Sequence, residues 1–170
     1  MIQIIETDRL ILRSTIIEDA EFVLELLNTP KWIEYIGDRN VRSLDDAKQY
    51  IVHKILPQYK KLGYGNFTVI RKLDNKKIGS CGLFDREGLK GVDMGFGFLP
   101  ECEHNGYGYE SANKVKQLAK ENYNLKQINA ITSQHNTSSQ KLLKKLGLTY
   151  LRLITLPDSN EELMLYQLTF

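Results

Sequence analysis

Two glycines in the second half of the chain, Gly106 and Gly108, have the types and spacing that point most directly to chemistry. They follow a predicted strand and open a predicted helix. Helix N-termini expose unpaired backbone N–H groups and a partial positive charge, so anions bind there readily. Glycine also lets a phosphate approach the backbone without a side chain in the way. The segment therefore predicts a phosphate site made of backbone, although two glycines can also simply make a turn.

The segment matches other phosphate-binding loops less well. The dinucleotide-binding fingerprint requires a third glycine at position 111, where Ser111 stands. The glycine-lysine-serine or glycine-lysine-threonine sequence of the P-loop does not occur in this segment. Both departures disfavour a nucleotide-binding regulator.

The strand before the glycines carries a second candidate, Asp93. Asp93 shares one face of this strand with Gly95 and Gly97, and glycines in a strand leave bare backbone where a ligand or another backbone often comes close. Asp93 could accept a proton through water, but a solvated or ion-paired acid is an equally good interpretation. The other face carries four large apolar residues: Val92, Met94, Phe96 and Phe98.

A third candidate is the pair Asn136 and Ser139, which share one face of the first turn of a predicted helix. Asn136 can act as the cap of this helix by accepting a hydrogen bond from the N–H of Ser139. The spacing alone does not separate capping from ligand binding.

Strand and helix patterns indicate how these candidates are positioned. A capping-box pattern at Thr15–Glu18 predicts the start of a first helix, which Asn28-Thr29-Pro30 ends. Ser43 predicts a second helix, kinked or split at Pro57. Two more helices are predicted to begin near Tyr109 and at Asn136, the last one ending at Gly147. Strands are predicted at 10–13, 66–71, 77–84, 92–99, 127–132, 148–154 and 163–168, the second and third forming a hairpin.

This order predicts an α/β (α+β) chain with a mixed sheet of about seven strands and about four helices on both faces. The net charge is +2 and no run of five like charges occurs, which argues against a nucleic-acid partner or a membrane surface. Two cysteines and three scattered histidines match no metal motif. The N-terminus has no signal-peptide pattern and no apolar run is long enough to span a bilayer, so we expect a cytoplasmic protein.

Several motifs together resemble one family. Thr7–Arg13 is similar to the first strand of the GNAT superfamily of N-acetyltransferases, in particular its RimJ/RimL-type branch. Asp93–Phe98 resembles the fourth strand of that branch, and Gly106–Glu110 resembles its Gly-Tyr-Ala/Gly-x-Glu loop. Asn136–Ser139 resembles its Asn-x-x-Ser motif, and Lys145–Leu148 its Lys-x-Gly-Phe motif. Each motif alone is weak, but they occur in the correct order over nearly the whole chain.

The resemblance implies one GNAT-like acetyltransferase domain over residues 1–170, with a central mixed, mostly antiparallel sheet. It implies transfer of an acetyl group from acetyl-CoA to a primary amine, on a protein N-terminus or a small molecule, by direct attack in a ternary complex. No metal is implied. The amine is not identified, and both a monomer and a homodimer stay open. A non-catalytic acyl-CoA-binding module is the alternative.

The resemblance also assigns roles to residues. Backbone N–H groups near Phe98 and Leu99 would hold the thioester carbonyl. Asn136 would contact the pantetheine arm or a bound water, Ser139 would protonate the leaving thiolate, and Asp93 is a candidate base. Acceptor contacts fall on Trp32, Tyr35 and Tyr64, for which ordinary packing is the competing interpretation. The pyrophosphate would lie on the segment that contains Glu103, His104, Asn105, Gly106, Tyr107, Gly108 and Tyr109.

One position departs from the family pattern. Glu103 stands where the family usually carries Arg or Gln. An acid beside a pyrophosphate is unfavourable unless it points away. We therefore expect main-chain N–H groups, rather than side-chain charge, to hold the pyrophosphate.

Overall fold

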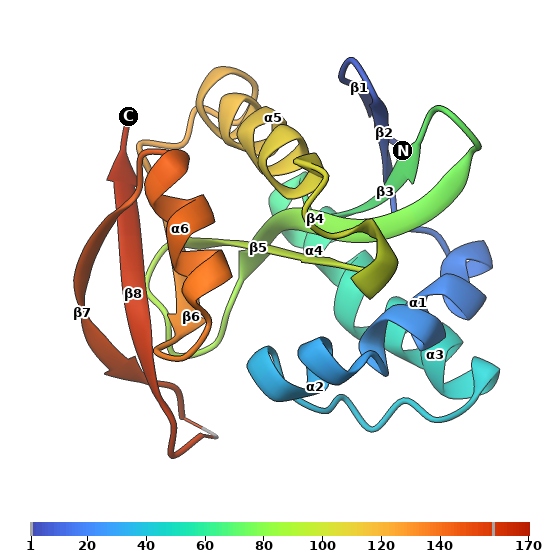
Figure 1. Cartoon of the computed structure of the whole chain (residues 1–170), viewed down its shortest axis with the longest axis horizontal. Helices are drawn as coiled ribbons and strands as arrows, with labels where there is room; N and C mark the ends of the chain where they lie inside the picture. Colours follow the sequence, from blue (N-terminus) through green and yellow to red (C-terminus); the bar gives the residue numbers. More distant parts are fainter. Residues whose placement is uncertain (1, 158) are drawn as a thin grey trace.

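The computed structural model describes residues 2–157 and 159–170, and within them eight strands form one open sheet (Figure 1). The strand order is β1-β2-β3-β4-β5-β6-β8-β7. Neighbouring strands pair antiparallel except β5 and β6, which are parallel. The strands are β1 (Ile4–Glu6), β2 (Leu10–Ser14), β3 (Asn66–Arg71), β4 (Lys76–Asp85), β5 (Val92–Phe98), β6 (Gln127–Ser133), β7 (Thr149–Thr155) and β8 (Glu162–Thr169).

The helices lie on both faces of the sheet, as the sequence predicted. Figure 1 shows α5 and α6 on one face and the helices of the N-terminal half on the other. The α-helices are α1 (Ala20–Leu27), α2 (Pro30–Tyr35), α3 (Leu44–Tyr50), α4 (Leu56–Leu62), α5 (Tyr107–Glu121) and α6 (Thr137–Lys145). Shorter turns are η1 (Ile17–Asp19) and η3 (Pro100–Cys102), and a π-helical segment, η2 (Ile51–Ile55), precedes Pro57. The predicted split of the second helix is confirmed.

The first helix begins differently from the prediction. Thr15 does not cap it, because its hydroxyl pairs with the hydroxyl of Thr68 at 2.9 Å. The carboxylate of Asp19, not that of Glu18, accepts the N–H of Ile16 at 3.0 Å. Asp19 is fully buried and bound by Arg13, so it is held in the position from which it can reach back.

Two elements were not predicted, and one boundary was misplaced. Strand β1 has only three residues, too few for a pattern. Helix α2 begins at Pro30, which the sequence suggested as a helix end, because proline is also favoured at the first helical position. Helix α5 begins at Tyr107 rather than near Tyr109.

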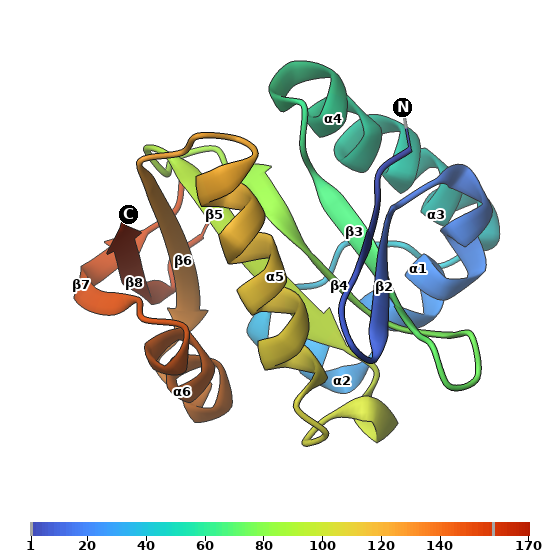
Figure 2. The same cartoon turned by 90° about the horizontal axis from the view of Figure 1, so that it is seen from above.

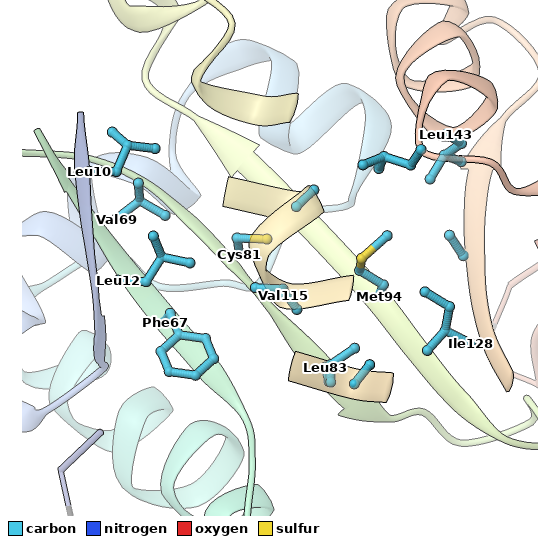
Figure 3. Packing of buried hydrophobic residues seen from close by; sticks show 14 of the residues in the cluster. Leu10, Leu12, Phe67, Val69, Cys81, Leu83, Met94, Val115, Ile128 and Leu143 are labelled. Carbon is cyan, nitrogen blue, oxygen red and sulfur yellow. The ribbon is translucent and has the colours of Figure 1, made fainter. Parts of the chain in front are cut away.

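The main core lies between the sheet and helices α5 and α6. Figure 3 shows side chains from the central strands gathered around Val115 of α5, with Leu143 of α6 at one end. Val115, Met94 and Ile128 are at most 2% exposed. Burial of each such side chain stabilises the fold by about 1.5–3 kcal/mol. This packing fixes α5 on β5, and therefore fixes the start of α5 at the end of that strand.

The sheet separates in its middle. Strands β5 and β6 have a single register pair among the described residues, Asp93 with Asn129. Beyond that pair the two strands diverge toward the ends from which the chain enters α5 and α6 (Figure 2). The N-termini of both helices therefore lie at the open side of the gap.

Candidate functional site

The N-terminus of α5 presents a run of free backbone donors. None of the N–H groups from His104 to Tyr109 donates to an acceptor within residues 2–157 and 159–170. The next N–H, of Glu110, is the first to bond within the helix, to the carbonyl of Gly106 at 3.0 Å. Six consecutive donors thus lie at the positive end of a 15-residue helix, the kind of position at which proteins often bind anions.

The loop that carries these donors has a defined shape. His104 and Gly106 have positive φ angles, +61° and +81°, which turn the backbone so that successive N–H groups converge. The side-chain amide of Asn105 donates to the carbonyls of Cys102 and Glu103, at 3.3 and 2.8 Å. The side chain of Asn105 therefore holds the loop from inside, and its backbone N–H stays free.

The acidic residues of the loop are paired with lysines. Glu103 forms an ion pair with Lys31 of α2, and Glu101 pairs with Lys76 of β4 at 2.9 Å. Lys76 draws the pKa of Glu101 below its ordinary value, so this carboxylate is ionised at neutral pH. Both acids thus carry a compensating charge close by, which removes much of the expected repulsion of a phosphate.

A basic residue from a distant part of the sequence also reaches the loop. The guanidinium of Arg9, beside β2, donates to Glu110 at 2.7 Å and to the carbonyl of Asn105 at 3.0 Å. It lies over the ring of Tyr107, with Cζ 4.6 Å from the ring centroid. Sequence reasoning missed this contact, because nothing local links position 9 to position 107.

Strand β5 offers a second set of donors across the gap from β6. The N–H of Leu99 donates to the carbonyl of Ile78 at 2.9 Å. Antiparallel pairs alternate between bonded and non-bonded positions, so Phe96 and Phe98 direct their N–H groups away from β4. The prediction for Leu99 is therefore wrong, because its N–H is already used, whereas Phe98 faces the gap.

The pair at the start of α6 is a helix cap. The side-chain oxygen of Asn136 accepts the N–H of Ser139 at 3.1 Å. Capping occupies this oxygen but leaves the side-chain NH₂ of Asn136 without an acceptor among the described residues. The hydroxyl of Ser139 is half-buried and likewise has no partner in that part of the chain. The NH₂ of Asn136 and the hydroxyl of Ser139 can therefore form further hydrogen bonds at the open side of the gap.

Asp93 is a buried ion pair rather than a free acid. Its side chain is 1% exposed, and the Nε of Arg86 donates to its Oδ2 at 2.6 Å. Its Oδ1 is buried and has no hydrogen-bond partner among the described residues. Burial raises the pKa of the Asp93 carboxyl, although Arg86 acts in the opposite direction.

The family is decided by comparison with known proteins. The family model described as an acetyltransferase (GNAT) domain matches residues 9–149. The chain belongs to the GNAT acetyltransferase family. As a GNAT protein it is an acetyl-CoA-dependent acetyltransferase, as its motifs implied.

Similar proteins agree with this assignment. The chain is 28% identical over 148 residues to the uncharacterized N-acetyltransferase YoaA of Bacillus subtilis, covering 86% of this chain and 83% of YoaA. Among solved structures, a GNAT-family acetyltransferase from Bacillus anthracis has a TM-score of 0.79 at 24% identity and 98% coverage of both chains. RimL, a ribosomal L7/L12 α-N-protein acetyltransferase in complex with coenzyme A, has a TM-score of 0.83 at 14% identity and the same coverage. At these identities the two structures show the fold.

The aromatic residues expected at the acceptor side of this GNAT protein lie in different places. Trp32 of α2 packs on β5, where a Cβ added to Gly97 would lie 2.5 Å from its ring. Gly97 is thus bare because an indole covers it, rather than a ligand or backbone. Tyr35 is half-buried on the same short helix.

Tyr64 does not lie with Trp32 and Tyr35 on helix α2. It is 6% exposed and stacks on Tyr123, with ring centroids 4.8 Å apart. Tyr123 follows the C-terminus of α5, whose 15 residues span about 22 Å from the glycine loop. The packing interpretation of Tyr64 is therefore the one that the structure supports.

The two cysteines of the GNAT chain are buried thiols. Burial raises the pKa of Cys81 to about 12 and that of Cys102 above its ordinary value, so neither is a thiolate at neutral pH. In the described residues, no group of three or more His, Cys, Asp or Glu side chains could hold a metal ion. No helix of that part of the chain is long and apolar enough to cross a membrane.

Proposed function

We propose that the protein transfers the acetyl group of acetyl-CoA to a primary amine, by direct attack in a ternary complex. The acceptor would be a protein N-terminus or a small amine, and residues 1–170 would act as one GNAT-like domain. The observation that carries this proposal is the run of six free N–H groups from His104 to Tyr109, placed where β5 and β6 separate. A diphosphate on this run would direct the rest of an extended ligand into the gap.

The residues along the gap fit the remainder of such a ligand. The N–H groups of Phe96 and Phe98 face the gap, as donors for a thioester carbonyl or the amides of a pantetheine arm. Fixed donors of this kind stabilise charge that develops on a carbonyl oxygen during reaction. The free NH₂ of Asn136 would bind the arm from the opposite side of the gap.

The reaction needs two proton transfers. The amine nitrogen would bond to the thioester carbon, and the carbon–sulfur bond would then break. The thiolate would take the hydroxyl proton of Ser139, which solvent replaces, and the amine nitrogen would lose one proton. An α-amine has a pKa near 8, so a useful fraction is already neutral at neutral pH.

Asp93 is the proposed acceptor of the amine proton, through water. Its Oδ1 has no hydrogen-bond partner within residues 2–157 and 159–170, and a carboxyl whose pKa is raised by burial is a better base near neutral pH. The alternative is a non-catalytic acyl-CoA-binding module. It is favoured by the ion pair with Arg86, which occupies the other oxygen of Asp93.

A thermal-shift experiment tests the ligand. The wild-type protein is heated with acetyl-CoA, CoA, NAD or ATP, and we expect stabilisation by the two CoA species. A ligand at 100 times its Kd adds about 2.7 kcal/mol of stability. No shift with either CoA species would refute the proposal.

A panel of amines then separates enzyme from binding module. Thiol release is followed with acetyl-CoA and N-terminal peptides, amino acids, polyamines and aminoglycosides, and mass spectrometry identifies the product. Acetylation of one class identifies the acceptor. A thermal shift without thiol release on any amine would favour the binding module.

A further inference from the structure

Arg9 is held against the glycine loop by three contacts that leave part of its guanidinium free. Its Nε and Nη1 donate to Glu110 and to the carbonyl of Asn105. Its plane lies on the ring of Tyr107. The third nitrogen, Nη2, donates to no acceptor within residues 2–157 and 159–170. The guanidinium of Arg9 is therefore held in place through Nε and Nη1, while the two N–H groups of Nη2 remain available to a ligand.

The free nitrogen points toward the loop. A Cβ added to Gly106 would lie 3.3 Å from Nη2, so the guanidinium occupies the space beside the backbone at the first turn of α5. Gly106 also has a φ of +81°, which side chains rarely adopt. Glycine at this position thus serves both the turn and the approach of Arg9.

Arg9 also borders an open groove along α5. The groove has a volume of about 1060 Å³, and its lining includes the cations Arg9, Lys114 and Lys145 as well as the acids Glu6, Asp8 and Glu110. Arg9 and Gly106 both line this groove, so the guanidinium and the start of α5 border the same surface hollow.

The other cations around the loop are engaged differently. Lys31 pairs with Glu103, and Lys76 pairs with Glu101. Arg71 forms two hydrogen bonds with Asp74, at 2.9 and 2.5 Å. Each of these three charges is matched by an acid. Lys145 of α6 is a further cation beside the loop, and its Nζ lies 4.3 Å from the ring centroid of Tyr109. Arg9 also has an acidic partner, but only its Nε is used for it.

We propose that Arg9, which directly precedes β2, is a pyrophosphate-binding residue and supplies the side-chain charge that Glu103 cannot supply from the loop. The Nη2 group would donate to a phosphate oxygen seated on the N–H run, while Nε and Nη1 keep the guanidinium in place. A guanidinium in a fixed fork suits phosphate oxygens better than an ammonium does. This inference rests on the proposed use of acetyl-CoA.

The test measures Kd by titration calorimetry for CoA, dephospho-CoA and pantetheine. Arg9→Gln is expected to weaken CoA and dephospho-CoA about 10-fold, because both carry the pyrophosphate, and to leave pantetheine unchanged. Tenfold corresponds to about 1.4 kcal/mol, within the range of a hydrogen bond to a charged group. Arg42→Gln is the matched control, because Arg42 is a similarly exposed, ion-paired arginine on another surface, and it should leave all three values unchanged.

A second variant separates binding from anchoring. Glu110→Gln weakens the attachment of the β1–β2 turn to α5 but keeps the Arg9 cation, so CoA affinity should be retained. If Glu110→Gln loses as much CoA affinity as Arg9→Gln, or if Arg9→Gln weakens pantetheine equally, Arg9 only anchors the turn and the inference is wrong. Unchanged CoA affinity in Arg9→Gln also overturns it.

Two further results complete the test. Should Arg9→Gln not fold, Arg9→Lys decides: a lysine keeps the charge but not the fork, so a loss of about threefold for CoA and none for pantetheine is expected. Equal CoA affinity in Arg9→Lys and wild type then counts against the inference. A wild-type protein that binds no CoA refutes the proposed function itself, whereas normal wild-type binding with an unaffected variant refutes only the role of Arg9.

Discussion

Replacing Gly97 by alanine should displace the indole ring of Trp32 from strand β5. The added Cβ would lie 2.5 Å from Cζ3 and 2.8 Å from Cε3 of the indole, and 3.5 Å from Ile36. Carbon atoms at optimal contact are about 3.5–4.0 Å apart, so the ring must move by about 1 Å or more. Overpacking of this size costs about 1–3 kcal/mol of stability.

The cost should disappear when the indole is removed. With Trp32→Ala in place, the Cβ of Gly97→Ala keeps only an ordinary contact with Ile36, at 3.5 Å, and alanine in a strand is favoured over glycine by about 0.5–1 kcal/mol. The strand preference for alanine is present in both backgrounds, so the two substitutions should be coupled by the overpacking cost alone, about 1–3 kcal/mol. Urea unfolding of the wild type, the two single variants and the double variant measures this coupling as a double-mutant cycle.

Gly95→Ala is the control on the same face of the same strand. Its Cβ would lie 3.1 Å from the ring of Phe84 and does not approach Trp32. Its cost should be the same in both backgrounds. If Gly97→Ala costs as much with Trp32→Ala as without it, the glycine is not explained by the indole, and the reasoning is refuted.

Three further outcomes are expected. Ser139→Ala should lower kcat by about 100-fold, the lower range for a general acid, with the KM for acetyl-CoA unchanged. Unchanged turnover, under conditions in which release of the thiol limits the rate, would remove Ser139 from the mechanism. Asn136→Asp keeps the capping oxygen but loses the NH₂ donor, so its Tm should be retained while its KM for acetyl-CoA rises. Asn136→Ala loses both groups and should also cost about 1 kcal/mol of stability. Equal KM values in Asn136→Asp and wild type would limit Asn136 to capping. Burial opposes ionisation of Asp19, but the hydrogen bonds from Arg13 and Lys77 prevail and hold the pKa of its carboxyl below the ordinary value. The ionised carboxylate therefore stabilises the fold above about pH 4, and this stabilisation is lost as the pH falls through the folded-state pKa. Urea midpoints from pH 7 to pH 2 should therefore fall more steeply for the wild type than for Asp19→Asn, and parallel curves would contradict this.

Local patterns predicted most of the fold because they report on local physics. The enrichment in Phe, Thr, Val and Ile predicted β3, and alternating apolar residues predicted β5, both nearly to the residue. Pro30 misled the prediction, because proline both ends helices and begins them, and only the packing of Trp32 on β5 favours a start there. Strand β1 is too short to show any period.

The candidate site was predictable where it depends on backbone. The glycine loop and the Asn136 cap are local features, and their positions were confirmed. The Leu99 N–H could not be assigned, because its use depends on the register with β4. An ion-paired Asp93 was one of the two interpretations, but its partner Arg86 could not be named from the sequence. The ion pair of Glu103 and the contacts of Arg9 could not be predicted either, because they join residues that only the folded chain brings together.

The separation of β5 from β6 gives the protein an unpaired strand edge inside a sheet. Exposed edges on the rim of a sheet invite pairing with other chains and aggregation. Here the edge of β5 is flanked by β6 and by the N-termini of α5 and α6, so a strand from another protein meets these elements before it reaches the edge. The fold can therefore keep backbone donors open for a slender, extended molecule while limiting the association that such an edge would otherwise cause.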